Sequence, residues 1–349
     1  GIVLFINSLA LIAGSYLGGR MYDKDRKNAR RWLLGAIFLS TSAVFLLIFF
    51  NDWPTFAVLL FLDNFGGGIA ITIGNSLATG IKEKSSRQVF NMLYFMQNVG
   101  VVIGTLLVGV LVEISIEWIF ISNFILFAFY LFVVYRHYYV PKAALVKEQV
   151  AKKGQDKTPR RYVWVIGAIL ILFFAIETGY SQWQSNLSIY MESLGISVKS
   201  YGFLWTINGI VIVCGQPVLN KLLDDILKIK LIYKLYLGSA LFVLGFFTLL
   251  FATDYPHFIL TMVIVTLGEI LTFPTIPAVV DNLSTLSEKG KYQGAVSVFA
   301  ALGRAIGPLA GGLIVDNSSY DMLFTVMIAL MGLTTLFVIV VAQFNLVKK

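Results

Sequence analysis

The chain has 349 residues, of which 58% are hydrophobic and only 13% are charged. Because soluble domains carry about 25% charged residues, this composition excludes an ordinary water-soluble protein and a long disordered chain. One cysteine and two histidines exclude a disulfide scaffold and offer too few ligands for a metal centre, so we expect no metal and no other cofactor. The chain is predicted to be a polytopic membrane protein.

A helix needs about 20 mostly apolar residues to cross the ~30 Å hydrocarbon layer of a membrane. Eleven runs in the sequence meet that requirement. Helices are expected rather than strands, because the runs are too long and too uniformly apolar for the alternating segments of a membrane barrel. In chain order, the predicted spans are residues 1–19, 32–50, 55–80, 89–112, 118–135, 162–190, 200–219, 232–251, 258–280, 293–315 and 322–345.

The Lys and Arg residues orient these spans. Nearly all of the 27 lie in alternate loops and in the C-terminal tail, and the exceptions are Lys199 in an opposite loop and Arg304 inside a span. The positive-inside rule puts the basic loops in the cytoplasm. We therefore predict a multi-pass protein of the cell membrane with a cytoplasmic C-terminus. Its partners should include the lipid bilayer and no nucleic acid, although the formal net charge is +8.

Two parts of the sequence match one another at a nearly constant spacing, which indicates an internal repeat. Fewer spans precede the repeated residues in the first half, so we expect that half to begin about one helix upstream of Gly1. The inferred parent has twelve spans in two six-helix halves, and its first helix is absent from this chain. The matching pairs are Gly14 with Gly215, Asp23 with Asp224, Gly100 with Gly303, and Gly104 with Gly307.

The predicted fold class is therefore all-α: a polytopic membrane helical bundle with two pseudo-symmetric halves, five and six helices here. Residues 1–136 should form the N-terminal bundle, residues 137–161 a polar cytoplasmic linker, and residues 162–349 the C-terminal bundle. Parallel repeats of this kind, with a substrate held between the halves near the midplane, are a transporter architecture.

The loop after the first span reads Gly14-Ser-Tyr-Leu-Gly-Gly-Arg-Met-Tyr-Asp-Lys-Asp-Arg-Lys-Asn28. It resembles the signature between the second and third helices of the major facilitator superfamily, with Arg26 where that family has its second glycine. The resemblance and the helix dipole predict that Asp23 lies at the N-terminal end of the span beginning near Gln293. Lys24 or Arg26 should pair with Glu83, which completes a cytoplasmic gate. The matching motif residues are Gly19, Met21, Asp23, Lys24 and Lys27.

The span 293–315 contains the run Gly303-Arg-Ala-Ile-Gly-Pro-Leu-Ala-Gly-Gly312. Small residues four apart allow helices to pack closely, and a proline favours a bend. The run resembles the glycine-proline signature of bacterial drug:proton antiporters in the same superfamily. That signature belongs to their fifth helix, where this chain has Thr105 in place of the proline. Helix packing is predicted at Gly100, Gly104, Gly303, Gly307 and Pro308.

These resemblances imply a secondary transporter, not an enzyme, that works by alternating access with a small-molecule substrate and protons as partners. Proton-coupled export of lipophilic compounds is the function they predict first. One alternative is proton-coupled uptake of a nutrient, such as a sugar or small metabolite. A second is a non-transporting sensor on the same scaffold. The protein is expected to be a monomer.

Ionisable residues inside membrane spans are costly and therefore indicate function. Polar side chains recur at helical spacing after Glu177 and, separately, along the span 89–112, and they should face water or substrate rather than lipid. For each carboxylate the alternative is a structural ion pair or a polar contact between helices. The predicted proton-coupling and substrate-cavity residues are Asp63, Asn98, Glu177, Ser181, Gln184, Glu269 and Arg304.

Glu269 and Arg304 are predicted to pair, because they lie at similar depth on consecutive spans that run in opposite directions. Glu177 has no obvious cationic partner in the sequence. It is therefore predicted to be the carboxylate that exchanges protons, with Asp63 as a further candidate.

Overall fold

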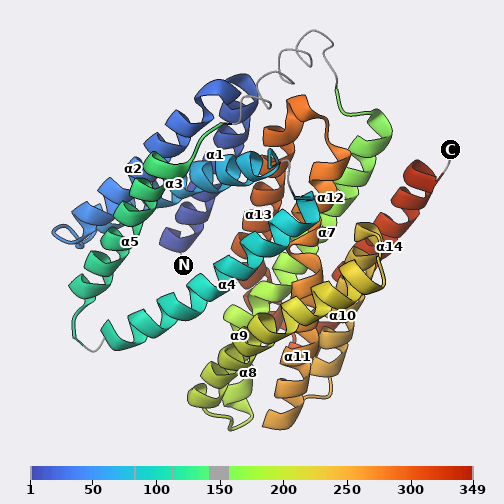
Figure 1. Cartoon of the computed structure of the whole chain (residues 1–349). Helices are drawn as coiled ribbons and strands as arrows, with labels where there is room; N and C mark the ends of the chain where they lie inside the picture. The colour runs from blue at the N-terminus through green and yellow to red at the C-terminus, as the bar shows by residue number, and fades with distance from the viewer. Residues whose placement is uncertain (1, 82–83, 112–113, 141–156, 348–349) are drawn as a thin grey trace. The chain divides into compact units, whose positions relative to one another are not determined.

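The computed structural model describes residues 2–81, 84–111, 114–140 and 157–347. All regular secondary structure in these residues is helical (Figure 1). Helices are the expected result, because backbone N–H and C=O groups in lipid must be paired within their own segment. Nine stretches of the described residues are long and apolar enough to span a membrane. The predicted all-α membrane bundle is confirmed.

The helices belong to two compact units. Helices α4 (Ser86–Leu111) and α13 (Lys289–Asn317) contribute residues to both units. The predicted division of the chain at the linker stays a prediction, because part of α4 before the linker belongs to unit 2 and part of α13 after it belongs to unit 1. Unit 1 consists of Gly1–Ser86, Ile103–Thr158 and Leu283–Ala301, and unit 2 consists of Arg87–Val102, Pro159–Asn282 and Leu302–Lys349.

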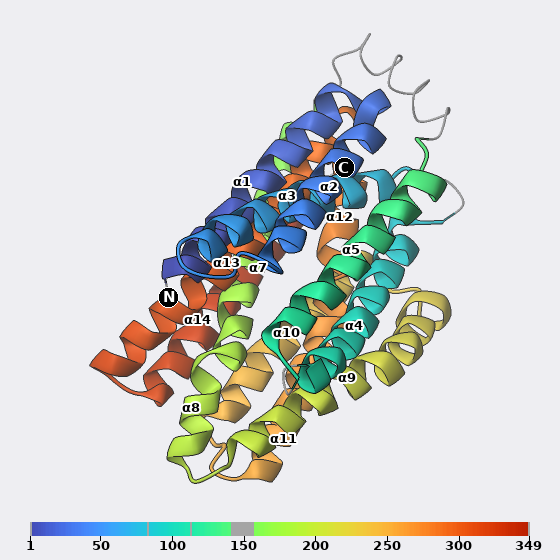
Figure 2. The ribbon, with the colours of Figure 1, turned by 90° about the vertical axis from the view of Figure 1, so that its left-hand side faces the viewer.

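Unit 1 is built on four long helices, which lie side by side (Figures 1 and 2). Glycines let the first and third approach closely, since a Cβ at Gly68 would lie 2.9 Å from the Ser15 nitrogen. The second helix packs against the third and fourth, and its core includes Leu33, Ile37 and Val134. The four are α1 (Ile2–Lys24), α2 (Ala29–Leu47), α3 (Thr55–Ala78) and α5 (Ile116–His137).

Unit 2 contains the remaining helices. α10 packs against α11 through two glycines, and a Cβ at Gly268 would lie 2.9 Å from the Gly238 carbonyl oxygen. α14 contacts α7 and α10, and α9 contacts α11. The helices are α7 (Arg160–Gln184), α8 (Asn186–Ser193), α9 (Val198–Asn220), α10 (Leu231–Leu249), α11 (Tyr255–Thr272), α12 (Thr275–Leu283) and α14 (Tyr320–Ala342).

Each of the eleven predicted runs contains a helix, but two of the runs are divided. The run 162–190 is interrupted at Ser185, which separates α7 from α8. The run 258–280 is interrupted between α11 and α12. Pro274 lies in that second break and has no N–H, so it cannot donate the hydrogen bond that would continue α11.

Candidate functional site

In unit 2, α7 and α13 approach one another along a row of glycines. A Cβ at Gly303 would lie 2.6 Å from the Cβ of Glu177, and one at Gly307 would lie 2.8 Å from the Thr178 carbonyl oxygen. Gly311 continues the row one turn later, against α7 again. The close packing predicted for Gly303 and Gly307 is therefore present, because only glycine leaves room for the facing backbone.

The same approach brings Arg304 to Glu177. Nη1 of Arg304 donates a hydrogen bond to Oε1 of Glu177 at 2.5 Å, and the Glu177 side chain is 3% exposed. The predicted pair of Arg304 with Glu269 is therefore wrong. Position along a span predicts depth in the membrane, but the partner depends on direction around the helix axis. Arg304 follows the first glycine of the row, so its side chain reaches α7.

Glu269 on α11 accepts hydrogen bonds from three neutral side chains. The hydroxyl of Tyr94 donates to Oε1 at 2.8 Å, and the hydroxyl of Tyr180 donates to Oε2 at 3.1 Å. Nδ2 of Asn208 donates to Oε2 at 2.9 Å. All four residues are buried. Within the described ranges, no cation forms an ion pair with Glu269, so the pairing is the reverse of the predicted one: Glu177 has a cationic partner and Glu269 has neutral donors.

The Glu177–Arg304 ion pair, together with Glu269 and its three hydrogen-bond donors, forms a group of six residues that we call the acid cluster. Tyr180 connects its two halves, because it donates to Glu269 and lies almost one helical turn after Glu177 on α7. The carboxylates of Glu177 and Glu269 are close enough to repel one another. With both ionised, the cluster has one more negative than positive charge, and one proton makes it neutral. Its members are Tyr94, Glu177, Tyr180, Asn208, Glu269 and Arg304.

Aromatic rings pack against the tyrosines of the acid cluster. The ring of Phe273 lies 5.5 Å from that of Tyr180 and 6.2 Å from that of Tyr94, measured between centroids. The rings of Phe173 and Phe242 lie 5.8 and 6.0 Å from Phe273. Phe273 meets Tyr94, Tyr180 and Phe173 edge to face and stacks on Phe242. Such packing holds the rings in defined orientations, so the two hydroxyls that bind the Glu269 carboxylate are held in place.

Two further predicted polar residues bind within their own helices. Nδ2 of Asn98 donates to the Tyr94 carbonyl oxygen at 2.9 Å, and Oγ of Ser181 donates to the Thr178 carbonyl oxygen at 2.8 Å. Gln184 is the exposed last residue of α7. The predicted polar stripe on this helix therefore ends there.

Asp63 belongs to unit 1, whereas the acid cluster belongs to unit 2. It is half-buried on α3, and its main-chain oxygen accepts a hydrogen bond from Oγ of Ser40 at 2.9 Å. Asp63 stays a candidate proton or substrate residue by prediction alone.

Sequence reasoning missed Tyr180 and Asn208. A signal existed for Asn208, since it is an amide inside the apolar run 200–219. Tyr180 carries no charge and gives no signal, because its role depends on the carboxylate that α11 presents to it. Gln182 was also missed: it is buried, and its Nε2 donates to the Gly307 carbonyl oxygen at 2.9 Å.

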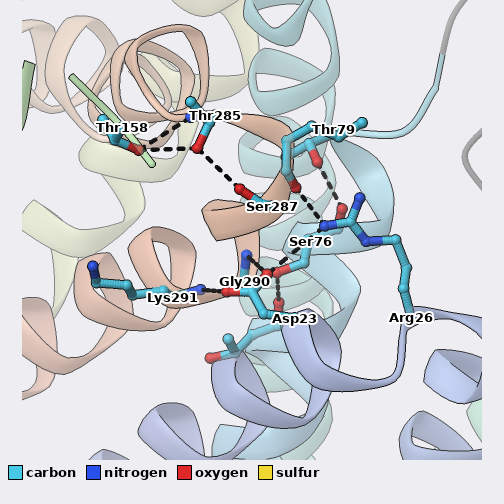
Figure 3. Close-up of polar contacts among 11 residues, drawn as sticks. Asp23, Arg26, Ser76, Thr79, Thr158, Thr285, Ser287, Gly290 and Lys291 are labelled. Carbon is cyan, nitrogen blue, oxygen red and sulfur yellow. Dashed lines mark hydrogen bonds and ion pairs between the residues drawn. The ribbon is translucent and has the colours of Figure 1, made fainter. Parts of the chain in front are cut away.

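Unit 1 contains the contact predicted for the gating motif. Figure 3 shows Asp23, at the end of α1, reaching the first turn of α13. The backbone N–H of Gly290 donates to Oδ1 at 2.8 Å, and that of Lys291 donates to Oδ2 at 2.6 Å. The position predicted for Asp23 is confirmed. The first N–H groups of a helix have no partner within it, and they favour an anion.

Glycines allow this contact. A Cβ at Gly19 would lie 2.5 Å from the Gly290 carbonyl oxygen, so α1 and α13 touch backbone to backbone there. Burial raises the pKa of Asp23, which lies beyond the apolar run 1–19, to about 6. The two backbone N–H groups and Arg26 act on that pKa in the opposite direction.

The basic residues of the motif divide into buried and exposed ones. Lys24 and Lys27 are exposed. Arg26 is buried instead, and its Nη2 donates to the Leu286 carbonyl oxygen at 2.5 Å. The predicted partner Glu83 lies outside the described residues. Arg26 therefore stabilises the segment that leads into α13, a role that its departure from the family pattern did not predict.

Thr158, two residues before α7, is anchored to that same segment. The Thr158 backbone N–H donates to Oε2 of Glu288 at 2.9 Å. The hydroxyls of Thr158 and Thr285 lie 3.2 Å apart (Figure 3). These bonds fix the end of the predicted linker in unit 1.

A second aspartate makes a similar contact in unit 2. Asp224, the repeat partner of Asp23, pairs with Arg87 on α4 and with Lys234 on α10, both at 3.2 Å. Nδ2 of Asn91 adds a hydrogen bond at 3.1 Å. Because α4 is the repeat partner of α13, each aspartate contacts the first turns of a corresponding helix. Lys234 is completely buried, and sequence reasoning missed it.

The packing predicted on α4 is not found. A Cβ at Gly100 or Gly104 would meet no described atom within 4 Å. Spacing alone did not distinguish these glycines from Gly303 and Gly307, because a small residue packs closely only where a neighbouring helix faces it. α13 continues as a helix through Pro308.

Comparison with known proteins identifies relatives over nearly the whole chain. A family model described as Major Facilitator Superfamily matches residues 1–285 and 237–346. The uncharacterized MFS-type transporter YttB of Bacillus subtilis (strain 168) is 34% identical over 326 residues, which cover 91% of this chain and 79% of that protein.

Solved structures share the fold at low identity. The proton:xylose symporter XylE has a TM-score of 0.77 and 13% identity, covering 98% of this chain and 85% of that one. The human organic anion transporter MFSD10 (TETRAN) has a TM-score of 0.71 and 13% identity, covering 96% and 83%. At such identity the likeness concerns the fold alone.

Proposed function

The chain belongs to the major facilitator superfamily, and we propose that it couples passage of its substrate to protons through Glu269. Members of this superfamily are transporters and not enzymes, so the chain carries small molecules across a membrane. The observation that supports proton coupling is a buried carboxylate whose hydrogen-bond donors among the described residues are all neutral, beside an ion pair.

Charge balance distinguishes the two glutamates. A proton on Glu177 would leave the guanidinium of Arg304 without its counter-charge, which is costly inside a membrane. A proton on Glu269 leaves no charge unpaired and removes the repulsion between the carboxylates. Protonated Glu269 still has an oxygen that can accept from Tyr94, Tyr180 or Asn208. Glu269 is therefore the better proton carrier, although the sequence pattern favoured Glu177.

Two directions of transport are compatible with this coupling. Export of lipophilic compounds is the one that the resemblance to drug:proton antiporters predicts. The rings packed around Phe273 and Tyr180 support it, because they offer an apolar environment beside the proton site. Uptake of a nutrient together with a proton is the second candidate. The partly exposed guanidinium of Arg304 supports it, because a polar solute needs a fixed hydrogen-bond donor in the membrane.

For Asp23 we propose a gating role. Its two bonds to the start of α13 involve a single side chain, so they can open and close as one unit during alternating access. We also propose that the protein resides in the cell membrane with a cytoplasmic C-terminus and acts as a monomer.

Reconstituted full-length protein in liposomes with an imposed pH gradient tests the coupling. A panel of compounds is first screened with the wild type. Those that the wild type accumulates are then tested with the variant Glu269→Gln. We expect the variant to exchange labelled compound across the membrane but to lose accumulation driven by the pH gradient. The matched control is Glu192→Gln on α8, where the glutamate is exposed. Accumulation at the wild-type level in Glu269→Gln would show that the proton is carried elsewhere.

A further inference from the structure

Arg304 has more N–H donors than it has acceptors among the described residues. A guanidinium has several N–H donors in a rigid fork, and within the described residues its one hydrogen-bond partner is Oε1 of Glu177. The Arg304 side chain is 43% exposed, whereas that of Glu177 is 3% exposed. The ion pair therefore has one buried side and one accessible side, and the accessible side is the cationic one.

The accessible side points away from the exposed apolar side of α13. On α13 the exposed apolar residues include Ile306, Leu309 and Leu313, which mark the lipid-facing side of this helix. Leu313 lies nine residues after Arg304, about two and a half helical turns, and so on the opposite side of the helix. A charged side chain at this depth is expected to face the protein interior or water, and the position of Arg304 agrees with that expectation.

We propose that the free N–H groups of Arg304 bind an anionic group on the transported compound, a carboxylate being the simplest case. This proposal rests on the proton coupling proposed above. A carboxylate fits the fork of a guanidinium through two parallel hydrogen bonds. Glu177 occupies only one nitrogen, so it holds the guanidinium in place while the other donors remain available.

Charge balance then links the anion to a proton. The acid cluster is neutral when one carboxylate is protonated, and a bound anion without that proton would leave two uncompensated negative charges. Binding of the proton therefore strengthens binding of the anion, and the reverse also holds. The two then cross the membrane in the same direction, which favours uptake together with a proton over export in exchange for one. The titratable groups around the site are Glu177 and Tyr180 on α7, Glu269 on α11, Tyr94 on α4 and Tyr201 on α9, with Arg304 on α13.

The test measures binding to the full chain in lipid nanodiscs. The probes are a panel of aromatic carboxylates, each with its matched primary amide and primary amine. In the wild type we expect at least one carboxylate to bind tenfold or more tightly than its amide. Hydrogen bonds to a charged group contribute more than those between neutral groups, by enough to change an affinity by about tenfold. The affinity of that carboxylate should rise as the pH falls, by up to about tenfold per pH unit when one proton accompanies each anion.

The variant Arg304→Gln should lose the preference for the carboxylate over the amide. Arg304→Lys should keep part of it, because lysine retains the charge but not the fork. Since Arg304→Gln leaves Glu177 buried without a counter-charge, the double variant Glu177→Gln/Arg304→Gln is measured as well and should also lack the preference. The matched control is Arg160→Gln, an exposed arginine at the start of α7.

If no carboxylate in the panel binds more tightly than its amide, or if the preference survives in the double variant, the inference is overturned. Failure of the proton coupling has a different signature. In that case the carboxylates bind Arg304-dependently, but Glu269→Gln leaves the pH dependence of their affinity unchanged. Tightest binding of the amines would instead assign the site to cations.

Discussion

Adding one methyl group at Gly303 should separate α7 from α13. A Cβ at this position would lie 2.6 Å from the Cβ of Glu177, 2.7 Å from the Phe174 carbonyl oxygen and 3.1 Å from the Thr178 nitrogen. Carbon atoms in contact are normally about 3.5–4.0 Å apart, so the helices must move by roughly 1 Å. None of the three atoms is the end of a flexible side chain. Overpacking of this kind costs about 1–3 kcal/mol.

The assay is thermal unfolding of the purified protein, followed by tryptophan fluorescence. Gly303→Ala should lower the apparent Tm, and it should weaken the pH-driven accumulation because the Arg304–Glu177 pair is displaced. Gly312→Ala is the matched control on the same helix, since a Cβ there meets no described atom within 4 Å. It should be neutral or slightly stabilising, because alanine favours a helix over glycine. Equal Tm values for the two variants would refute the close approach of α7 and α13.

Other variants test the remaining contacts. Asp23→Asn has one acceptor oxygen where the carboxylate has two, so transport should slow while expression is largely kept; an unchanged rate would rule out gating. Because the pKa of Asp23 is about 6 in this contact and about 4 in water, a fall in pH from 7 to 5 should favour the contact. Hydrogen exchange at the first amides of α13, corrected for intrinsic rates, should therefore show greater protection at pH 5, and equal protection would contradict this sign. Glu177→Gln should reduce the yield of folded protein by breaking a buried pair, at a cost of about 3–5 kcal/mol. Its combination with Arg304→Gln should recover most of that yield, and no recovery would argue against the pair. Lys234→Met should destabilise unit 2 when measured by thermal unfolding, because among the described residues Asp224 is then left with one cation, the partly exposed Arg87; a wild-type Tm would mean that the buried lysine contributes little.

The sequence alone predicted where the helices lie. Lipid acts as a uniform apolar solvent that leaves backbone groups no outside partner, so length and hydropathy are enough to identify a span. The contact of Asp23 with α13 was also predictable, because a loop motif and a helix N-terminus are both visible in the sequence. The close packing of Gly303 and Gly307 followed from their spacing.

Only the tertiary structure decided which charged and polar groups meet. Arg304 is as deep in its span as Glu269 is, yet it pairs with Glu177, because the glycine row on α13 turns that side of the helix toward α7. Glu269 instead receives hydroxyl and amide donors from three other helices. Gly100 and Gly104 have the same spacing as their repeat partners but no neighbour at contact distance among the described residues. Rotation of each helix about its axis depends on the summed packing of all its neighbours, which periodicity along one segment does not encode.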